Sequence, residues 1–238
     1  VIPKDALMGV LTLDESGKNN EQLDLPVGNY YVKELETNVG FVLDENKYEF
    51  TFAYDKDSTK ETSCVELDEI HNAKRRLDIE IKKVDKDNGD VLLDGAVFEV
   101  IDKTTNTNQG IVVSGKLAIK GDSANEEYEI AKDEDFNEII QTVKTNDSKE
   151  IILDLDEGVY YSRKKGSEEI SKHIVKDGHA VFANAIYGHE YEFKEIEAPS
   201  SYELSKEPFE VKVVVDKDQD TITYTFKNNR IDIPNTGV

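Results

Sequence analysis

Residues 191–202 read YEFKEIEAPSSY, and the pattern of residue types in this stretch decides the fold. Its first half alternates, so that Tyr191, Phe193 and Glu195 share one face of an extended strand, while Glu192 and Lys194 share the other. A carboxyl group therefore lies on the same face as two aromatic rings. Because burial strips water from a charge, Glu195 must be neutral or paired there, unless it stands at a strand end that leans into solvent.

Two other predicted strands also carry a polar side chain in line with an apolar row. Residues 77–84 read LDIEIKKV, and the alternation places Lys83 on the same strand face as Leu77, Ile79 and Ile81. Residues 221–228 read TITYTFKN, and the alternation places Asn228 on the same strand face as Ile222, Tyr224 and Phe226. An amine, a carboxylic acid and a carboxamide on three strands predict a buried group of polar side chains that satisfy one another.

Three stretches resemble the Cna-B (SpaA-like) immunoglobulin-type domains of Gram-positive pilins and adhesins. They read KKVDKDNGDVLLDGAVFEV (82–100), YEFKEIEAPSSYEL (191–204) and TYTFKNN (223–229). The middle stretch is similar to the E-box of that family, in which a tyrosine, a glutamate, an Ala-Pro pair and a second tyrosine follow at fixed spacing. The resemblance implies an all-β fold of immunoglobulin-like sandwiches in which the first and last strands lie side by side.

The resemblance also implies a chemistry for the three polar residues. Lys83 would be the nucleophile, Asn228 the electrophile and Glu195 the proton shuttle of an internal isopeptide bond that forms once, with loss of ammonia. Burial beside aromatic rings would lower the pKa of the lysine so that the amine is neutral. Glu195 would hydrogen-bond the carboxamide, polarise its carbonyl and move protons during the attack. The protein would then not be a turnover enzyme.

Composition narrows the functional classes. The 238 residues carry a formal net charge of −22, which argues against nucleic-acid and anionic membrane partners. No apolar run is long enough for a membrane span, and the start is not a signal peptide. The single cysteine, Cys64, excludes an intrachain disulfide. Neither a zinc spacing of histidines nor a nucleotide-binding loop occurs, and residues 85–90 depart from the EF-hand pattern, so we expect no metal and no cofactor.

An internal repeat predicts two domains of one kind in tandem. YYVKELETNVGFVL (30–43) aligns with residues 191–204 and sets Glu34 against Glu195, and a later strand ends near Asn72 as another ends near Asn228. We interpret residues 1–74 as the C-terminal part of a first domain whose N-terminal strands are missing, because no strand with a suitable lysine precedes its E-box. Glu34 and Asn72 then form a possible but incomplete first-domain site.

The second domain, residues 77–230, is larger than the resemblance leads one to expect, and we assign an insertion to about 104–175. Within it, residues 133–144 read DEDFNEIIQTVK, whose apolar side chains recur at i, i+3, i+4 and i+7. This spacing predicts one short amphipathic helix capped near Asp133. The flanking stretches 149–155 and 158–164 are typical of strands. The insertion either binds a ligand or fills an interface, and the sequence favours neither.

The C-terminal residues Ile233, Pro234, Asn235, Thr236 and Gly237 resemble an LPxTG-type sortase motif, with isoleucine in place of leucine. Proline holds the backbone extended, which suits an enzyme groove. The resemblance implies a sortase that cuts after Thr236 and joins it to another pilin subunit or to peptidoglycan. We therefore predict an extracellular, wall-anchored structural protein, most simply a pilin subunit. The alternative is a wall-anchored adhesin that binds a host protein or glycan through the 104–175 insertion.

Overall fold

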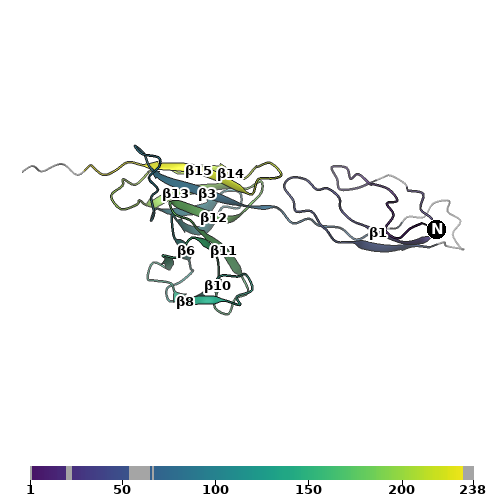
Figure 1. The fold of residues 1–238 in the computed structure, drawn as a ribbon, viewed down its shortest axis with the longest axis horizontal. Helices are drawn as coiled ribbons and strands as arrows, with labels where there is room; N and C mark the ends of the chain where they lie inside the picture. Colours follow the sequence, from purple (N-terminus) through teal and green to yellow (C-terminus); the bar gives the residue numbers. More distant parts are fainter. Residues whose placement is uncertain (1, 20–22, 54–64, 66, 233–238) are drawn as a thin grey trace, which may run out of the picture. The chain divides into compact units, whose positions relative to one another are not determined.

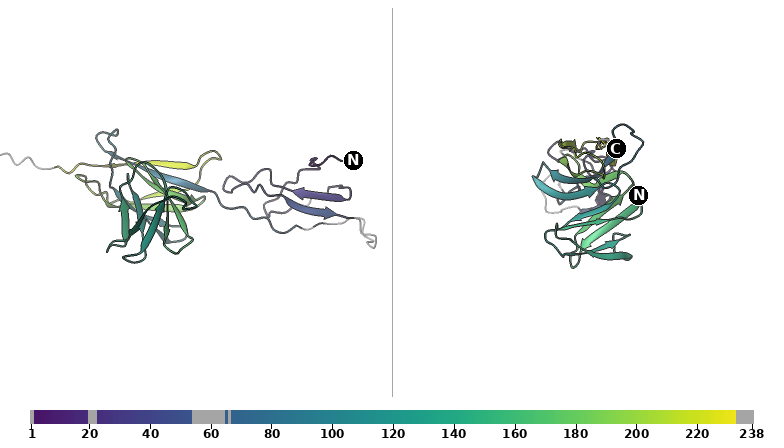
Figure 2. Two further views of the ribbon diagram at one scale, coloured as in Figure 1. Left: turned by 60° about the horizontal axis from the view of Figure 1, so that its bottom comes forward. Right: turned by 90° about the vertical axis from the view of Figure 1, so that its left-hand side faces the viewer.

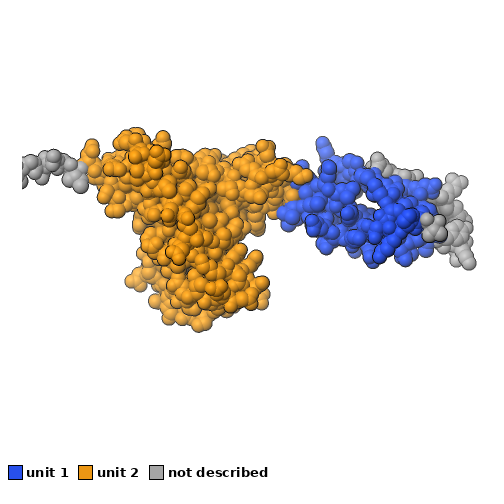
Figure 3. Space-filling view, viewed as in Figure 1, with its two compact units in different colours: residues 1–38, 42–73 blue, residues 39–41, 74–238 orange. Residues whose placement is uncertain are grey.

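The computed structural model describes residues 2–19, 23–53, 65 and 67–232, so Cys64 and the predicted sorting motif at 233–237 lie outside the described residues. Every regular element in the described part is a β-strand, which confirms the predicted all-β class apart from the one short helix (Figure 1). None of the described residues forms a helix that could cross a membrane. The chain divides into unit 1, residues 1–38 and 42–73, and unit 2, residues 39–41 and 74–238 (Figure 3).

Unit 1 has one described sheet of two antiparallel strands, β1 (Gly28–Val32) and β2 (Tyr48–Phe52). Tyr30 stacks on Phe50 across this pair, with ring centroids 5.6 Å apart. No large apolar side chain of the described part of the unit is buried, and those of Leu7 and Val27 are 76% and 62% exposed. The described residues of unit 1 therefore do not enclose a core of their own.

Unit 2 is built on a sandwich of two sheets. In the first sheet β3 (Arg76–Asp85) lies between β12 (His179–Ile186), which is antiparallel to it, and β15 (Thr221–Asn228), which is parallel. The predicted side-by-side placement of the first and last strands of this domain is confirmed. Since β3 is the central strand, its inward side chains are fully enclosed.

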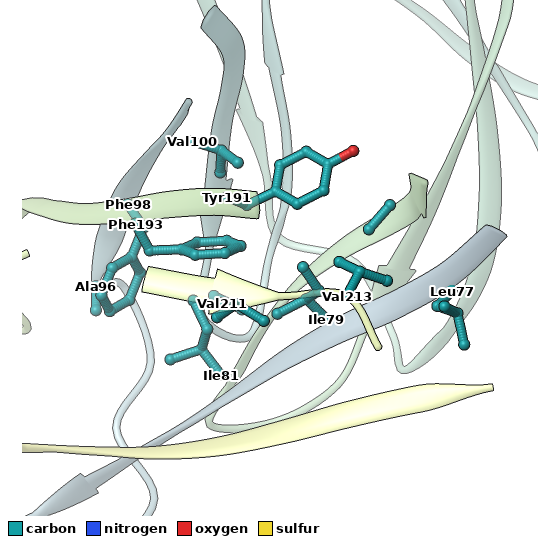
Figure 4. Close-up of a cluster of buried hydrophobic side chains, with 12 residues drawn as sticks. Leu77, Ile79, Ile81, Ala96, Phe98, Val100, Tyr191, Phe193, Val211 and Val213 are labelled. Carbon is teal, nitrogen blue, oxygen red and sulfur yellow. The ribbon is translucent and has the colours of Figure 1, made fainter. Parts of the chain in front are cut away.

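The second sheet of the sandwich has the order β14-β13-β4-β5 and is antiparallel throughout. Its strands are β4 (Val97–Asp102), β5 (Thr107–Val113), β13 (Glu190–Glu197) and β14 (Phe209–Lys212). Alternate side chains of both sheets meet in one apolar core, in which Ile79, Phe98 and Phe193 are completely buried (Figure 4). The period of two in the sequence therefore sets which side chains face the core.

Although β5 lies within the stretch assigned to the insertion, it pairs with β4 in the sandwich, and the rest of the insertion forms two further sheets between β5 and β12 (Figures 1 and 2). Their orders are β11-β10-β7-β8 and β6-β9. The strands are β6 (Leu117–Lys120), β7 (Glu127–Ala131), β8 (Ile139–Lys144), β9 (Glu150–Leu153), β10 (Gly158–Lys164) and β11 (Ile170–Val175). A separate apolar cluster that includes Leu117, Ile130 and Tyr160 lies in this part. The predicted strands at 149–155 and 158–164 are thus confirmed as β9 and β10.

The helix predicted at 133–144 is wrong. Asp133 does accept hydrogen bonds from the backbone N–H groups of Asn137 and Glu138, at 3.0 and 2.8 Å, but these bonds close a turn. Phe136 has a φ of 56° there, which an α-helix does not allow. The chain then pairs with β7 as β8. A run of β-branched residues in 139–143 favours a strand, and pairing with β7 outweighs the helical spacing.

Candidate functional site

The three polar side chains singled out in the sequence meet inside the sandwich. Lys83 extends from β3 and Asn228 from β15 in one sheet, while Glu195 extends from β13 in the facing sheet. Their exposed fractions are 0%, 2% and 2%. Lys83 Nζ lies 2.8 Å from Glu195 Oε1 and donates a hydrogen bond to Asn228 Oδ1. The structure therefore brings the predicted nucleophile into direct contact with the predicted electrophile.

Glu195 contacts the nitrogen atoms of the site. Each of its carboxyl oxygens lies 3.0 Å from Asn228 Nδ2, and Oε2 also accepts a hydrogen bond of 2.7 Å from the backbone N–H of Ser205. The Asn228 carbonyl oxygen accepts its hydrogen bond from Lys83 Nζ, so polarisation of this carbonyl by Glu195 stays a prediction. Glu195 bridges the amine and the amide nitrogen.

The amide of Asn228 is held on both sides. Besides its contacts with Glu195, Nδ2 donates a hydrogen bond of 2.8 Å to the backbone carbonyl of Glu203. Among the described residues, no buried side-chain nitrogen or oxygen lacks a hydrogen-bond partner. The partners Ser205 and Glu203 act through their backbone, so no residue type in the sequence could have pointed to them.

Aromatic rings form the apolar wall of the site. Lys83 Nζ lies 4.0 Å from the ring centroid of Phe226 and 5.5 Å from that of Phe98. The alternation along residues 221–228 places Phe226 on the face of Asn228. Phe98 was missed, because its only signal was its position in the apolar stretch of β4.

Burial lowers the pKa of Lys83 from 10.5 to about 8, against the opposing effect of its hydrogen bond and charge contact with Glu195. A drop of this size raises the share of neutral amine at pH 7 by about 300-fold. The lysine is therefore prepared to act as a nucleophile at a pH where an exposed lysine is almost fully protonated.

The geometry supports one kind of reaction. A partly neutral amine touches a carboxamide, a carboxyl group contacts both nitrogen atoms, and water is excluded from all three. Nucleophilic attack of an amine on an amide needs this combination of contact, amine deprotonation and protonation of the leaving nitrogen.

Unit 1 holds the acid and the amide of an equivalent arrangement. Asn72 Nδ2 lies 2.8 and 2.9 Å from the two carboxyl oxygens of Glu34, and the backbone N–H of Asp44 donates to Glu34 Oε2 at 2.8 Å. The third hydrogen bond of Asn72 Nδ2 goes to Thr37 Oγ1, at 2.8 Å. No hydrogen bond that the structure describes for the Asn72 side chain goes to a lysine.

The strand register shows that the two arrangements are copies. Tyr30 pairs with Phe50 in unit 1, and Tyr191 pairs with Val211 in unit 2. The offset of 161 residues that aligns Tyr30 with Tyr191 also aligns Phe50 with Val211. The sequence repeat therefore corresponds to a repeat of structure, although unit 1 has no described counterpart of β3 or β15.

Nothing in the described residues suggests a metal centre, since they contain no cluster of three or more histidine, cysteine, aspartate or glutamate side chains suited to a metal. The sandwich, with its amine, acid and amide from three strands, defines a class of β-domain with a buried polar group inside its core.

The family profile described as the SpaA prealbumin-like fold domain matches residues 4–66 and 77–230. The chain belongs to this family. No curated protein sequence matches the chain.

Several solved structures are similar to the chain. The minor pilin GBS52 of Streptococcus agalactiae is 20% identical, with 96% of this chain and 70% of that one covered and a TM-score of 0.32. The shaft pilin spaA of Lactobacillus rhamnosus GG is 11% identical, with 94% and 69% covered and a TM-score of 0.32. The TIE protein of Bacillus anthracis is 17% identical, with 92% and 45% covered and a TM-score of 0.27. The chain thus spans less than half of that last structure.

Proposed function

We propose that the chain is part of a sortase-anchored surface protein, a pilin subunit, whose second domain is locked by an isopeptide bond between Lys83 and Asn228. The observation that carries this proposal is the buried contact of Lys83 with Asn228 and with Glu195. Membership of the SpaA family agrees with it. The protein would be a structural element that reacts once and binds no cofactor.

The bonds and protons of the proposed reaction balance with Lys83, Asn228 and Glu195 alone. Lys83 Nζ attacks Asn228 Cγ, so that a C–N bond forms and the bond from Cγ to Nδ2 breaks. One proton leaves Nζ through Glu195 and reaches Nδ2, which departs as ammonia. Glu195 ends as it began, and its contacts of 2.8 Å to Nζ and 3.0 Å to Nδ2 make this transfer short.

Intact mass spectrometry tests the cross-link. We expect the mass of the protein to fall below the sequence mass by one ammonia, and the Lys83→Met variant to show the full sequence mass. Asn88 precedes Gly89 in an exposed turn, where ring closure of the asparagine would also release ammonia. Proteolysis and sequencing of the branched peptide that contains residues 83 and 228 separate the two reactions, and finding only the Asn88 product would refute the cross-link.

Assembly through a sortase rests on the motif at 233–237, which lies outside the described residues. We propose that the acyl group of Thr236 is transferred to an amine of the next subunit or of peptidoglycan, which places the protein outside the cell. Incubation with a class of sortase that recognises such motifs should join the chain to an amine probe. The Thr236→Ala variant is the matched control, and labelling that persists in it would contradict the assignment.

The alternative role as an adhesin has one supporting observation. The insertion carries its own apolar cluster and exposes large apolar side chains on several strands, among them Ile139, Ile152, Val159 and Ile170. A host protein or glycan would be its ligand. Deletion of the insertion that abolishes attachment to host matrix while polymers still form would favour the adhesin over the pilin.

A further inference from the structure

Asp85 is a buried carboxylate that the proposed reaction does not use. It ends β3, two residues beyond Lys83 and on the same face, and it is 1% exposed. Its Oδ2 accepts hydrogen bonds from Tyr202 Oη at 2.8 Å and from Arg230 Nε at 2.6 Å. These bonds, with Arg230 first, hold the pKa of Asp85 well below its usual range. A charge enclosed this way is costly unless it is paired, and Tyr202 and Arg230 supply its partners.

The contacts of Asp85 join three segments that are distant in sequence. Tyr202 belongs to the loop after β13, and Arg230 follows the end of β15. A β-bridge joins Tyr202 to Arg230, and the backbone N–H groups of Glu203 and Ile231 each donate a 2.9 Å hydrogen bond across the same two segments. The carboxylate therefore lies where the first strand, the E-box loop and the chain beyond the last strand converge.

This junction fixes the strand end that carries Asn228. Asn228 is the last residue of β15, and its register partner on β3 is Asp85 itself. The backbone N–H of Lys86 donates to the Asn228 carbonyl at 3.0 Å. Strand ends open more readily than strand centres, and an error of about 1 Å in the position of a reacting group can cost 100-fold in rate.

We propose that Asp85, together with Tyr202 and Arg230, is a positioning group that holds the end of β15 in register so that Asn228 meets Lys83. The inference rests on the proposed cross-link and deepens it. No hydrogen bond or ion pair that the structure describes joins these three side chains to the reacting nitrogen or carbon atoms, so they act through the backbone around Asn228. Their own ionisation would not enter the pH dependence of the reaction.

The rate of cross-linking tests the inference. The full chain is made by cell-free synthesis, and samples are taken over time for intact mass, while circular dichroism confirms the β-fold. We expect Asp85→Asn to lose ammonia at least about tenfold more slowly than the parent protein, with an unchanged pH profile because Lys83 still governs it. Asp87→Asn, in the same turn but bonded to Asp85 only through its backbone N–H, is the matched control and should react at the parent rate.

Three further variants keep the test decisive. Tyr202→Phe removes one hydrogen bond without a change of charge. If Asp85→Asn does not fold, the cross-linking rate and pH profile of Tyr202→Phe test the proposal in its place. Arg230→Lys keeps the charge and should react faster than Arg230→Ala. Parent-like rates in folded Asp85→Asn and Tyr202→Phe, or a shifted pH profile, would overturn the positioning role alone. A parent protein that never loses ammonia would instead overturn the cross-link itself.

Discussion

Replacement of Lys83 by methionine is the sharpest perturbation of the domain. Methionine fills nearly the same space beside Phe98 and Phe226 but offers no amine, so no cross-link can form. The proposed bond joins residues that are 145 apart in sequence. The chain-entropy relation for disulfides, applied by analogy to a loop of this length, gives about 5 kcal/mol of lost stability.

The expected loss can be read from thermal unfolding. For a domain of 150–250 residues, 1 kcal/mol shifts Tm by about 2–4 °C, so we expect the Tm of Lys83→Met to be about 10–20 °C below that of the parent. Calorimetry of both proteins at pH 7 measures the difference. Since Glu195 loses its partner in this variant, the double variant Lys83→Met, Glu195→Gln removes the unpaired carboxylate and isolates the cross-link contribution.

The result that would refute this reasoning is specific. If the parent and the double variant unfold at the same temperature, although the parent lacks one ammonia in mass and a branched peptide is found, then the bond does not constrain the unfolded chain as proposed. A parent protein with the full sequence mass would remove the bond itself.

Three other perturbations give separate expectations. Glu195→Gln keeps the size of the side chain but cannot shuttle a proton, so most molecules should keep the full sequence mass for hours after synthesis; rapid and complete loss of ammonia would contradict the role of the acid. Asn72→Ala should leave the mass loss of this chain at one ammonia, because the described bonds of Asn72 go to Glu34 and Thr37; restoration of the full mass would show that the bond lies in unit 1. Burial lowers the pKa of His173 from 6.5 to about 4, so the unfolded chain takes up this proton at higher pH than the folded one. Stability should therefore be full above about pH 6.5 and fall by roughly 3 kcal/mol as the pH approaches 4, a loss that His173→Gln should remove in thermal melts.

The sequence predicted the site residues because strand periodicity is a local property. Lys83, Glu195 and Asn228 each continue an apolar row, and the faces of β3, β13 and β15 follow from that alternation without knowledge of the sheet order. The assignment of the fold to immunoglobulin-like sandwiches was right for the same reason, with the resemblance to a family as a second guide.

Other features depend on contacts that no local pattern contains. The stretch 133–144 has helical spacing, yet residues 139–144 form β8, which pairs with the neighbouring strand β7. Glu195 contacts the amide nitrogen of Asn228 while Lys83 Nζ donates to its carbonyl oxygen, an arrangement that no local pattern specifies. No local pattern indicates the role of Asp85, since its partners Tyr202 and Arg230 lie more than a hundred positions further along the chain.

The parallel pairing of β3 and β15 decides which parts of unit 2 would feel a pull. With the proposed bond in place, force that enters at Arg76 would travel along β3 to Lys83, cross the bond to Asn228 and leave through Arg230. The strands of the insertion, β6 to β11, come between those two residues in the chain and lie off this route. Their exposed side chains could therefore change without altering the proposed path of the force.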